Sequence, residues 1–317
     1  MTPGSRRISF VAHALSALAV FCTTNLALAQ APAAAAARTL EPALELRVQN
    51  VRAGLNVIIG SGGNIVAWSG PDGIVLVDTG LAANSAAVVD AVARFAVAPV
   101  KFVINTHGHA DHVGGNEAFA RTGAVVIAHE SVLEHGGRDP AAPGGNGDAV
   151  IAQPVITTND TLAMHLNGDR LDVVHVVDAH TSADIVVRWN DADVVALGDI
   201  YWSGQYPYID VESGGSLAGT VAAIEAVLAR STSRTVVIPG HGPVSNRAEL
   251  AAYRDMLVDV GRNVREAVEK GMGVEEILAA KPTADFDARF GRPGALIAPD
   301  EFVRSIYRDL ASKRPGR

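Results

Sequence analysis

The chain has 317 residues, 48% hydrophobic and 19% charged, so it is long enough to bury a sizeable core and too apolar to be intrinsically disordered. Its 26 basic and 34 acidic side chains leave a formal net charge of −8, and aromatic residues make up only 5%. This balance excludes a nucleic-acid binder as the leading interpretation, because such proteins neutralise phosphates with clustered Lys and Arg and stack bases on aromatic rings. The single cysteine, Cys22, excludes an intramolecular disulfide.

The N-terminal segment has the pattern of an export signal. Arg6 and Arg7 precede an uncharged, largely apolar run over 8–37, and residues 27–29 (Ala-Leu-Ala) match a cleavage site before Gln30. We expect a signal peptide over 1–29 and a disordered, Ala/Pro-rich leader over 30–44. The mature protein would then be periplasmic or secreted, with no stable membrane insertion.

Two alternatives concern the same segment. The uncharged run is long enough to be an uncleaved transmembrane anchor, although polar residues 23–25 interrupt it. Ser5-Arg6-Arg7 leaves twin-arginine export open beside the general secretory route.

From about Glu45 to the C-terminus, short β-branched runs alternate with helical patterns, which predicts one α/β domain over 45–317. Residues 136–148, rich in Gly and Pro, are expected to form an exposed loop. Ser216 is expected to cap a helix, because Leu217, Val221, Ile224 and Leu228 follow it at helical spacing. The expected strands are 57–59, 64–68, 74–77, 102–104, 125–128, 161–164, 171–177, 185–189, 194–197 and 235–238, and the other expected helices are 85–95, one through 250–268 and one through 302–307.

Residues 106–112, Thr-His-Gly-His-Ala-Asp-His, directly follow an expected strand and concentrate four candidate ligands. His107 and His109 are two residues apart, so an extended backbone projects both to the same side. Asp111 and His112 follow where the chain turns, and they can face a second point nearby. Imidazole and carboxylate ligands suit zinc, iron or manganese, so this run predicts a metal site.

This run resembles the H-x-H-x-D-H signature of the metallo-β-lactamase fold superfamily, and the resemblance extends over 57–244. Asp78 resembles the aspartate that ends a strand near the metals in this family. His180 resembles the third histidine, although Ala183 replaces a usual glycine nearby. Asp199 resembles the carboxylate that bridges two metals, and His241 resembles the final histidine.

The resemblance implies a four-layer αββα sandwich and a dinuclear zinc site, with iron or manganese as alternatives. One ion would be held by His107, His109 and His180. The other would be held by Asp111, His112 and His241. Asp199 would bridge the two ions, which leaves the ligand set His107, His109, Asp111, His112, His180, Asp199 and His241.

The implied activity is hydrolysis of a small molecule with an amide, lactone or ester bond. Two ions lower the pKa of a shared water, which gives a hydroxide nucleophile near neutral pH, and they polarise the scissile carbonyl. Asp111 is expected to be catalytic, orienting this hydroxide or relaying a proton to the leaving group. One alternative is a mononuclear iron persulfide dioxygenase, which shares the motif. Another is a non-catalytic metal-binding protein on the same fold.

Asp199 and the absence of cysteine after residue 29 point away from β-lactamases that use a cysteine ligand and toward glyoxalase II-like, lactonase-like and cyclase-like branches. Trp202 stands where lactonases of the quorum-quenching type carry tyrosine. Residues 198–216 resemble exported zinc hydrolases of the lactamase-like or quinoprotein-relay-associated type. For Tyr201, Trp202, Tyr206 and Tyr208, packing is the simpler interpretation, with pocket lining as the alternative. His129, His135, His165 and His175 lack a ligand-type context, so no site role is expected for them.

Overall fold

The computed structural model describes residues 46–313, apart from 53, 96–97 and 136–152. The expected signal peptide, the leader and the loop over 136–148 lie outside the described residues. Their processing and structure therefore stay predictions. Within the described residues, no helix combines the length and apolar character that crossing a bilayer requires.

The first half of the described chain forms a seven-stranded sheet whose spatial order equals the chain order. The strands from β1 to β4 pair antiparallel, and those from β4 to β7 pair parallel. The carboxyl ends of β4, β5 and β6 therefore lie at one edge of the sheet. The strands are β1 (Arg47–Arg52), β2 (Leu55–Ile59), β3 (Ile65–Gly70), β4 (Gly73–Val77), β5 (Val100–Ile104), β6 (Val125–His129) and β7 (Ile156–Thr158).

A six-stranded sheet follows, in the order β13-β12-β11-β10-β9-β8. Because β10 is antiparallel to both β9 and β11, and β12 is parallel to β11, the strands β9, β11 and β12 run in one direction. Their carboxyl ends meet at a common edge. These strands are β8 (Thr161–Leu166), β9 (Asp169–His175), β10 (Ile185–Trp189), β11 (Val194–Ala196), β12 (Val236–Ile238) and β13 (Ser245–Asn246).

The two sheets pack face to face around a shared apolar core. Val66 and Trp68 of β3 point toward the second sheet, while Ile65 and Ala67 pack on the outer side of the first. Trp68 meets Trp189 of β10 edge-on across the interface, with ring centroids 6.2 Å apart. Burial on both faces explains why the central strands are almost continuously apolar in sequence.

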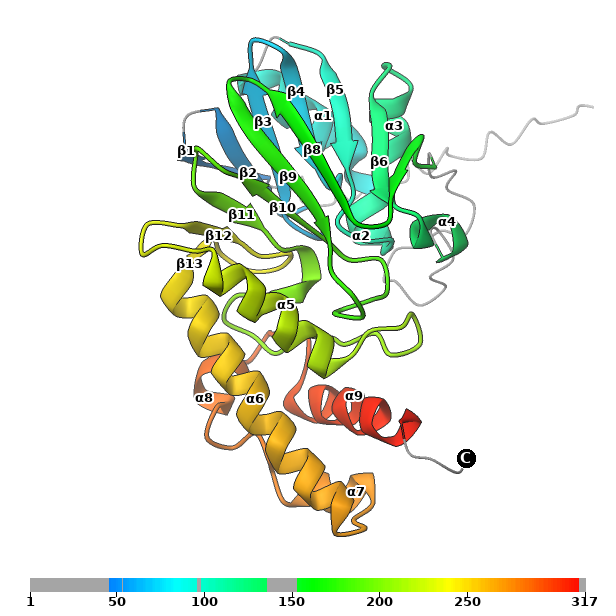
Figure 1. Ribbon diagram of the computed structural model, residues 1–317, viewed down its shortest axis with the longest axis vertical. Helices are drawn as coiled ribbons and strands as arrows, with labels where there is room; N and C mark the ends of the chain where they lie inside the picture. Colours follow the sequence, from blue (N-terminus) through cyan, green and yellow to red (C-terminus); the bar gives the residue numbers. More distant parts are fainter. Residues whose placement is uncertain (1–45, 53, 96–97, 136–152, 314–317) are drawn as a thin grey trace, which may run out of the picture. The chain divides into compact units, whose positions relative to one another are not determined.

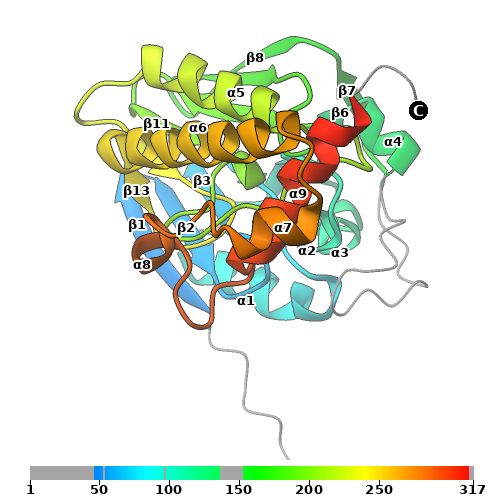
Figure 2. The same cartoon turned by 90° about the horizontal axis from the view of Figure 1, so that it is seen from below.

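Helices cover the outer faces of both sheets, which gives the expected α/β/β/α order of layers (Figure 1, Figure 2). On the first sheet, α1 (Ser85–Phe95) and α3 (Asn116–Ala120) contribute Val88, Val92 and Phe119 to the packing. On the second, α5 (Leu217–Ala229) and α6 (Arg247–Glu269) pack on Val186, Val195 and Val237, and α9 (Pro299–Ser312) packs on α6. The shorter helices are α2 (Ala110–Val113), α4 (Ser131–His135), α7 (Val274–Ala279), α8 (Asp287–Phe290) and the 3₁₀ turns η1 (Ala82–Asn84) and η2 (Gly198–Ile200).

The α/β prediction and most predicted elements are confirmed. α1 and β10 have the predicted bounds, and the Ser216 side chain caps α5 by accepting from the Gly219 N–H. The strand predicted over 171–177 lies two residues earlier, as β9. The predictions missed the strands β1, β7 and β13 and the short helices α2, α3, α4, α7 and α8, because these elements have few residues or are largely exposed and show no clear apolar period.

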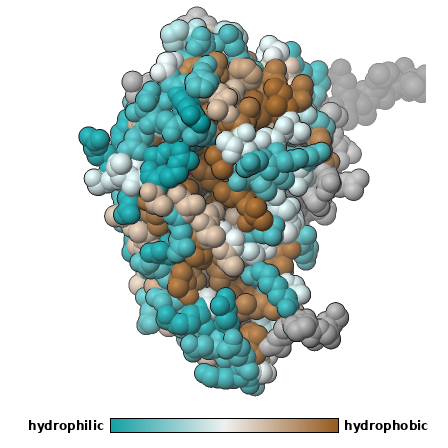
Figure 3. Space-filling view, viewed as in Figure 1, coloured by the Kyte–Doolittle hydropathy of each residue, from teal (hydrophilic) through white to brown (hydrophobic). Residues whose placement is uncertain are grey.

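Apolar side chains also reach the surface. Figure 3 shows them among hydrophilic residues over the face of the molecule that it displays. The most exposed large ones are Val155, Val177 and Leu296. Exposed apolar residues of this kind are normal on soluble domains and assign no function by themselves.

Candidate metal centre

All the residues that the sequence analysis nominated as ligands come together at the strand ends. His107 and His109 follow β5, and α2 then supplies Asp111 and His112. The other three come from the second sheet: His180 after β9, Asp199 in η2 after β11, and His241 after β12. Their side chains form two groups, His107, His109, His180 and Asp199 in one and Asp111, His112 and His241 in the other, with the candidate donor atoms of each group within 4.8 Å of one another.

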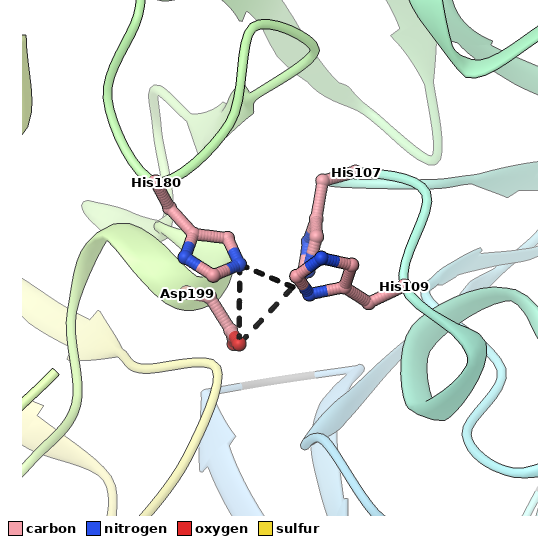
Figure 4. Close-up of side chains that lie close together, drawn as sticks. All are labelled: His107, His109, His180 and Asp199. Atoms are coloured by element: carbon pink, nitrogen blue, oxygen red, sulfur yellow. Dashed lines mark hydrogen bonds and ion pairs between the residues drawn. The ribbon is translucent and has the colours of Figure 1, made fainter. Parts of the chain in front are cut away.

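The first group is closely spaced around a common point (Figure 4). His180 Nε2 lies 3.1 Å from His109 Nδ1 and 3.7 Å from Asp199 Oδ2, and His107 Nε2 lies 3.9 Å from the same oxygen. Donors about 2.1 Å from a tetrahedral ion are about 3.4 Å from each other. The spacing is therefore that of a ligand shell.

The second group shares Asp199 with the first. His241 Nε2 is 3.3 Å from Asp111 Oδ2 and also 3.3 Å from Asp199 Oδ2. His112 Nε2 is 3.1 Å from Asp199 Oδ1 and 3.8 Å from Asp111 Oδ2. The Asp199 carboxylate thus reaches both groups, which is the position of a bridging ligand.

The buried atoms of the cluster fit a divalent cation. Among the described residues, His107 Nε2, His112 Nε2 and Asp199 Oδ1 are buried without a hydrogen bond of acceptable geometry. Buried polar atoms are rarely left unpaired in proteins. Here the unpaired atoms are imidazole nitrogens and a carboxylate oxygen, which are ligands that zinc and similar metals prefer.

Hydrogen bonds at Nδ1 orient three of the histidines so that Nε2 faces the cluster. The Nδ1–H groups of His107, His112 and His180 donate to Thr106 Oγ1 at 3.0 Å, Asp78 Oδ2 at 2.8 Å and the Tyr208 carbonyl at 2.9 Å. Each bond leaves Nε2 directed at the cluster. Asp78, expected to lie near the metals, also accepts from the Thr106 N–H and hydroxyl, both at 2.8 Å.

His109 has the opposite arrangement, and its partner is one that the sequence analysis missed. Nδ1 of His109 faces the cluster, and Nε2 lies 3.0 Å from Asp210 Oδ2. Asp210 is separated from His109 by 101 positions, and no spacing rule connects them. The resemblance noted over 198–216 is the one sequence signal that included this residue.

Burial and the nearby carboxylates give the histidines of the cluster different proton affinities. Burial lowers the pKa of His180 to about 4 and that of His107 well below its ordinary value. Burial also opposes protonation of His241 and His112, but Asp199 and Asp111 together, with Asp78 beside His112, outweigh it, raising the pKa of His241 to about 9 and that of His112 well above its usual range. His107 and His180 are therefore neutral near pH 7. Burial also disfavours protonation of His109, but its hydrogen bond to Asp210 and the charge of Asp199 raise its pKa, so a cation would compete with protons at His109 as well as at His112 and His241.

The aromatic residues after Asp199 are mainly structural. Tyr201 and Tyr206 are buried in the core beside α6 and α9. Trp202 donates its Nε1–H to the Asp199 carbonyl at 3.0 Å, and its ring packs on His241 with centroids 4.2 Å apart. Trp202 therefore supports a candidate ligand and presents no hydroxyl like that of the tyrosine it replaces. Tyr208 is partly exposed, beside His180.

The remaining histidines lie apart from both donor groups. His129 and His175 stack on each other with centroids 3.7 Å apart, and His165 is exposed on β8. The side chain of His135 lies outside the described residues.

Comparison with known proteins agrees with this geometry. A family model described as the metallo-beta-lactamase superfamily matches residues 60–245. A hydroxyacylglutathione hydrolase from Polaromonas sp. is 32% identical over 155 residues, which are 48% of this chain and 52% of that protein. The chain thus spans about half the length of this curated relative.

Solved structures share the fold. The stereoselective inverting sec-alkylsulfatase Pisa1 from Pseudomonas sp. superimposes with a TM-score of 0.71 at 18% identity, covering 86% of this chain and 51% of that one. A metallo-beta-lactamase from Pontibacter korlensis superimposes with a TM-score of 0.56 at 21% identity, covering 68% of this chain and 100% of that one. Because the family model matches more than half of the sequence, and the four layers and the His/Asp cluster agree with it, the chain belongs to the metallo-beta-lactamase superfamily, which together with the cluster implies a divalent metal.

Proposed function

We propose that this protein is an exported, dinuclear zinc-dependent hydrolase that attacks the carbonyl of an amide, lactone or ester in a small molecule. One observation carries the proposal: two donor groups lie side by side and share the Asp199 carboxylate. Asp111 and His112 belong to a motif that mononuclear dioxygenases share, but together with His241 they complete a donor group for a second ion, which favours the dinuclear enzyme.

The residues of the cluster have different roles, which follow from their positions. When bound, two zinc ions would supply Lewis acidity for a carbonyl oxygen and a water of lowered pKa. The negative charge of Asp199 offsets part of the charge of two dications. Asp111 has a 28% exposed side chain, whereas those of His112 and His241 are 0% and 7% exposed, so it is the group that a substrate or water reaches.

Asp111 is suited to proton transfer. Burial alone would raise its pKa, but His112 and His241 lower it below the ordinary value and keep the carboxylate ionised. An ionised Asp111 can accept a proton from the attacking water and return it to the leaving group.

The name of one relative supports hydrolysis of a small molecule, since the Polaromonas protein is named a hydroxyacylglutathione hydrolase. The type of bond is left to measurement. Export is supported by the basic and then apolar N-terminal pattern with Ala27-Leu28-Ala29 before Gln30.

The test is metal analysis of the purified protein together with a hydrolysis screen of lactones, esters, thioesters, phosphodiesters and β-lactams. We expect about two zinc ions per chain and turnover that a chelator abolishes and added zinc restores. Turnover of β-lactams is expected to be weak beside that of lactones or esters, because Asp199 is a bridging ligand that many β-lactamases lack. One bound iron with oxygen consumption on a persulfide, or two bound ions with no turnover of any substrate class, would overturn the proposal.

A further inference from the structure

The segment over 206–217 contacts two histidines of the first donor group. One is His180, which follows β9 of the second sheet, and the other is His109, which follows β5 of the first sheet. Tyr208 accepts from His180 Nδ1 through its carbonyl, and the Asp210 N–H donates to the His180 carbonyl at 3.0 Å. The Asp210 side chain reaches across to His109 at 3.0 Å. One segment therefore holds two of the three histidines.

The contact to His109 determines which nitrogen is available. A neutral imidazole carries one N–H, and the nitrogen without it is the ligand. Because Asp210 Oδ2 accepts from Nε2–H, Nδ1 of His109 carries no hydrogen, and this nitrogen faces the cluster. Asp210 is itself held, since its Oδ1 accepts from the Ser213 N–H at 3.2 Å, and it is only 8% exposed.

Both ends of the segment form hydrogen bonds with the C-terminal helices α8 and α9, which follow the region matched by the family model. The Tyr206 hydroxyl donates to Asp287 Oδ1 at 2.9 Å, and its ring stacks on Phe302 with centroids 5.0 Å apart. At the other end, the Leu217 N–H donates to Asp309 Oδ2 at 3.1 Å. The buried contacts leave little freedom for the residues between them.

We propose that Asp210 is a positioning residue that fixes the Nε2–H tautomer of His109, and that the C-terminal helices hold Asp210 in place through Tyr206. The inference rests on the proposed metal site. In this proposal the 206–217 segment orients ligands of the first donor group, whereas Asp78 at the end of β4 orients His112 in the second group.

The test compares zinc binding by Asp210→Asn and wild type. An Asn that keeps its oxygen on the Ser213 N–H turns its NH₂ toward His109 Nε2, which favours the Nδ1–H tautomer and blocks the ligand atom. We expect one of the two zinc ions to bind about 10- to 100-fold more weakly, with the other unchanged, by competition with a chromophoric chelator. Glu212→Gln is the matched control, because it removes the same charge from an exposed side chain of the same segment.

A second variant tests the link to the C-terminal helices. Tyr206→Phe removes the bonds to Asp287 and Thr283 and keeps the ring, so we expect the same ion to be weakened by a smaller factor. Tyr307→Phe, on α9, is its control. The visible spectrum of the Co²⁺-loaded protein should change for the weakened site alone.

The outcomes separate the two proposals. Wild-type protein without bound zinc would overturn the proposed function. Two zinc ions bound by wild type, and bound equally tightly by Asp210→Asn, would overturn the role of Asp210 alone. A general loosening, in which Asp210→Asn weakens both ions to the same extent, would also contradict it.

Discussion

The Asp78 carboxylate and the His112 imidazole form a buried pair, with Oδ2 2.8 Å from Nδ1 and both side chains at most 2% exposed. Asp78 adopts a left-handed backbone conformation, with φ of 62°, which is uncommon for residues other than glycine. The strain is tolerated because the carboxylate satisfies three buried donors, two from Thr106 and one from His112.

Replacing Asp78 therefore tests both folding and metal binding. Asp78→Ala leaves these donors unpaired and is expected to lower the free energy of unfolding of the metal-free protein by about 2–4 kcal/mol. Urea unfolding measures the loss. Asp78→Asn retains an acceptor and suits the positive φ, so its effect should be smaller on stability and clear on zinc affinity. An Asp78→Ala protein as stable as wild type would contradict this account.

The second donor group is tested by His241→Ala and His112→Ala. Each removes one of the few protein ligands of one ion, so elemental analysis should show the zinc content falling from about two toward one per chain. Hydrolysis should fall about 100-fold or more. Asp199→Asn should be at least as damaging, because Asp199 reaches both groups. His165→Ala, on the exposed face of β8, is the control and should change neither quantity.

Gly63 tests how closely the backbone must approach the site. Its N–H donates to the Asp111 carbonyl at 3.1 Å, and a Cβ at this position would overlap the His112 ring. Gly63→Ala should displace His112 and lower the zinc content. Because Gly63 does not have a positive φ, the substitution adds only the steric overlap and no backbone strain. Gly273→Ala is the comparison, since its Cβ would meet only the flexible end of Glu276, at 3.7 Å. Unchanged zinc content in Gly63→Ala would show that His112 is not a ligand in this position.

The two ions should differ in their dependence on pH. In the metal-free protein the pKa of His241 is raised to about 9 and that of His112 is also raised, so a cation must displace protons there at neutral pH. The pKa values of His107 and His180 are lowered, that of His180 to about 4, so these two histidines are already neutral. Of the first group only His109 has a raised pKa, because its hydrogen bond to Asp210 and the charge of Asp199 outweigh the effect of burial, so fewer protons must leave this group than the second. From pH 6.5 to 8.5, the affinity of the ion at His112 and His241 should rise by about tenfold per unit for each displaced proton. Chelator competition at several pH values, with His241→Ala to identify the ion, measures the difference; two ions with the same slope would refute it.

Processing of the N-terminus is tested by intact mass. If the chain is exported and cleaved after Ala29, the mature protein begins at Gln30 and lacks residues 1–29. Mass spectrometry of protein recovered from the periplasm should show this loss. Recovery of full-length chain in the membrane fraction would instead support the transmembrane anchor.

The sequence by itself determined the α/β class, most of the central strands and the residues that gather at the candidate metal centre. These features are local. Runs of β-branched residues form strands where they are buried, and residues 107–112 place four candidate ligands within six positions of the sequence. The resemblance to a known family then identified His180, Asp199 and His241 by their own short motifs.

Only the tertiary structure decided how those side chains are oriented. Asp210 reaches His109, and Tyr206 reaches Asp287, because the 206–217 segment packs between the second sheet and the C-terminal helices. The packing of Trp202 on His241 has the same origin. Such contacts depend on the free energy of burial and on hydrogen-bond geometry between segments far apart in the chain, and neither leaves a periodic pattern in the sequence. The edge strands β1, β7 and β13 are formed for a related reason, since backbone pairing to a neighbouring strand determines them more than their own largely exposed side chains do.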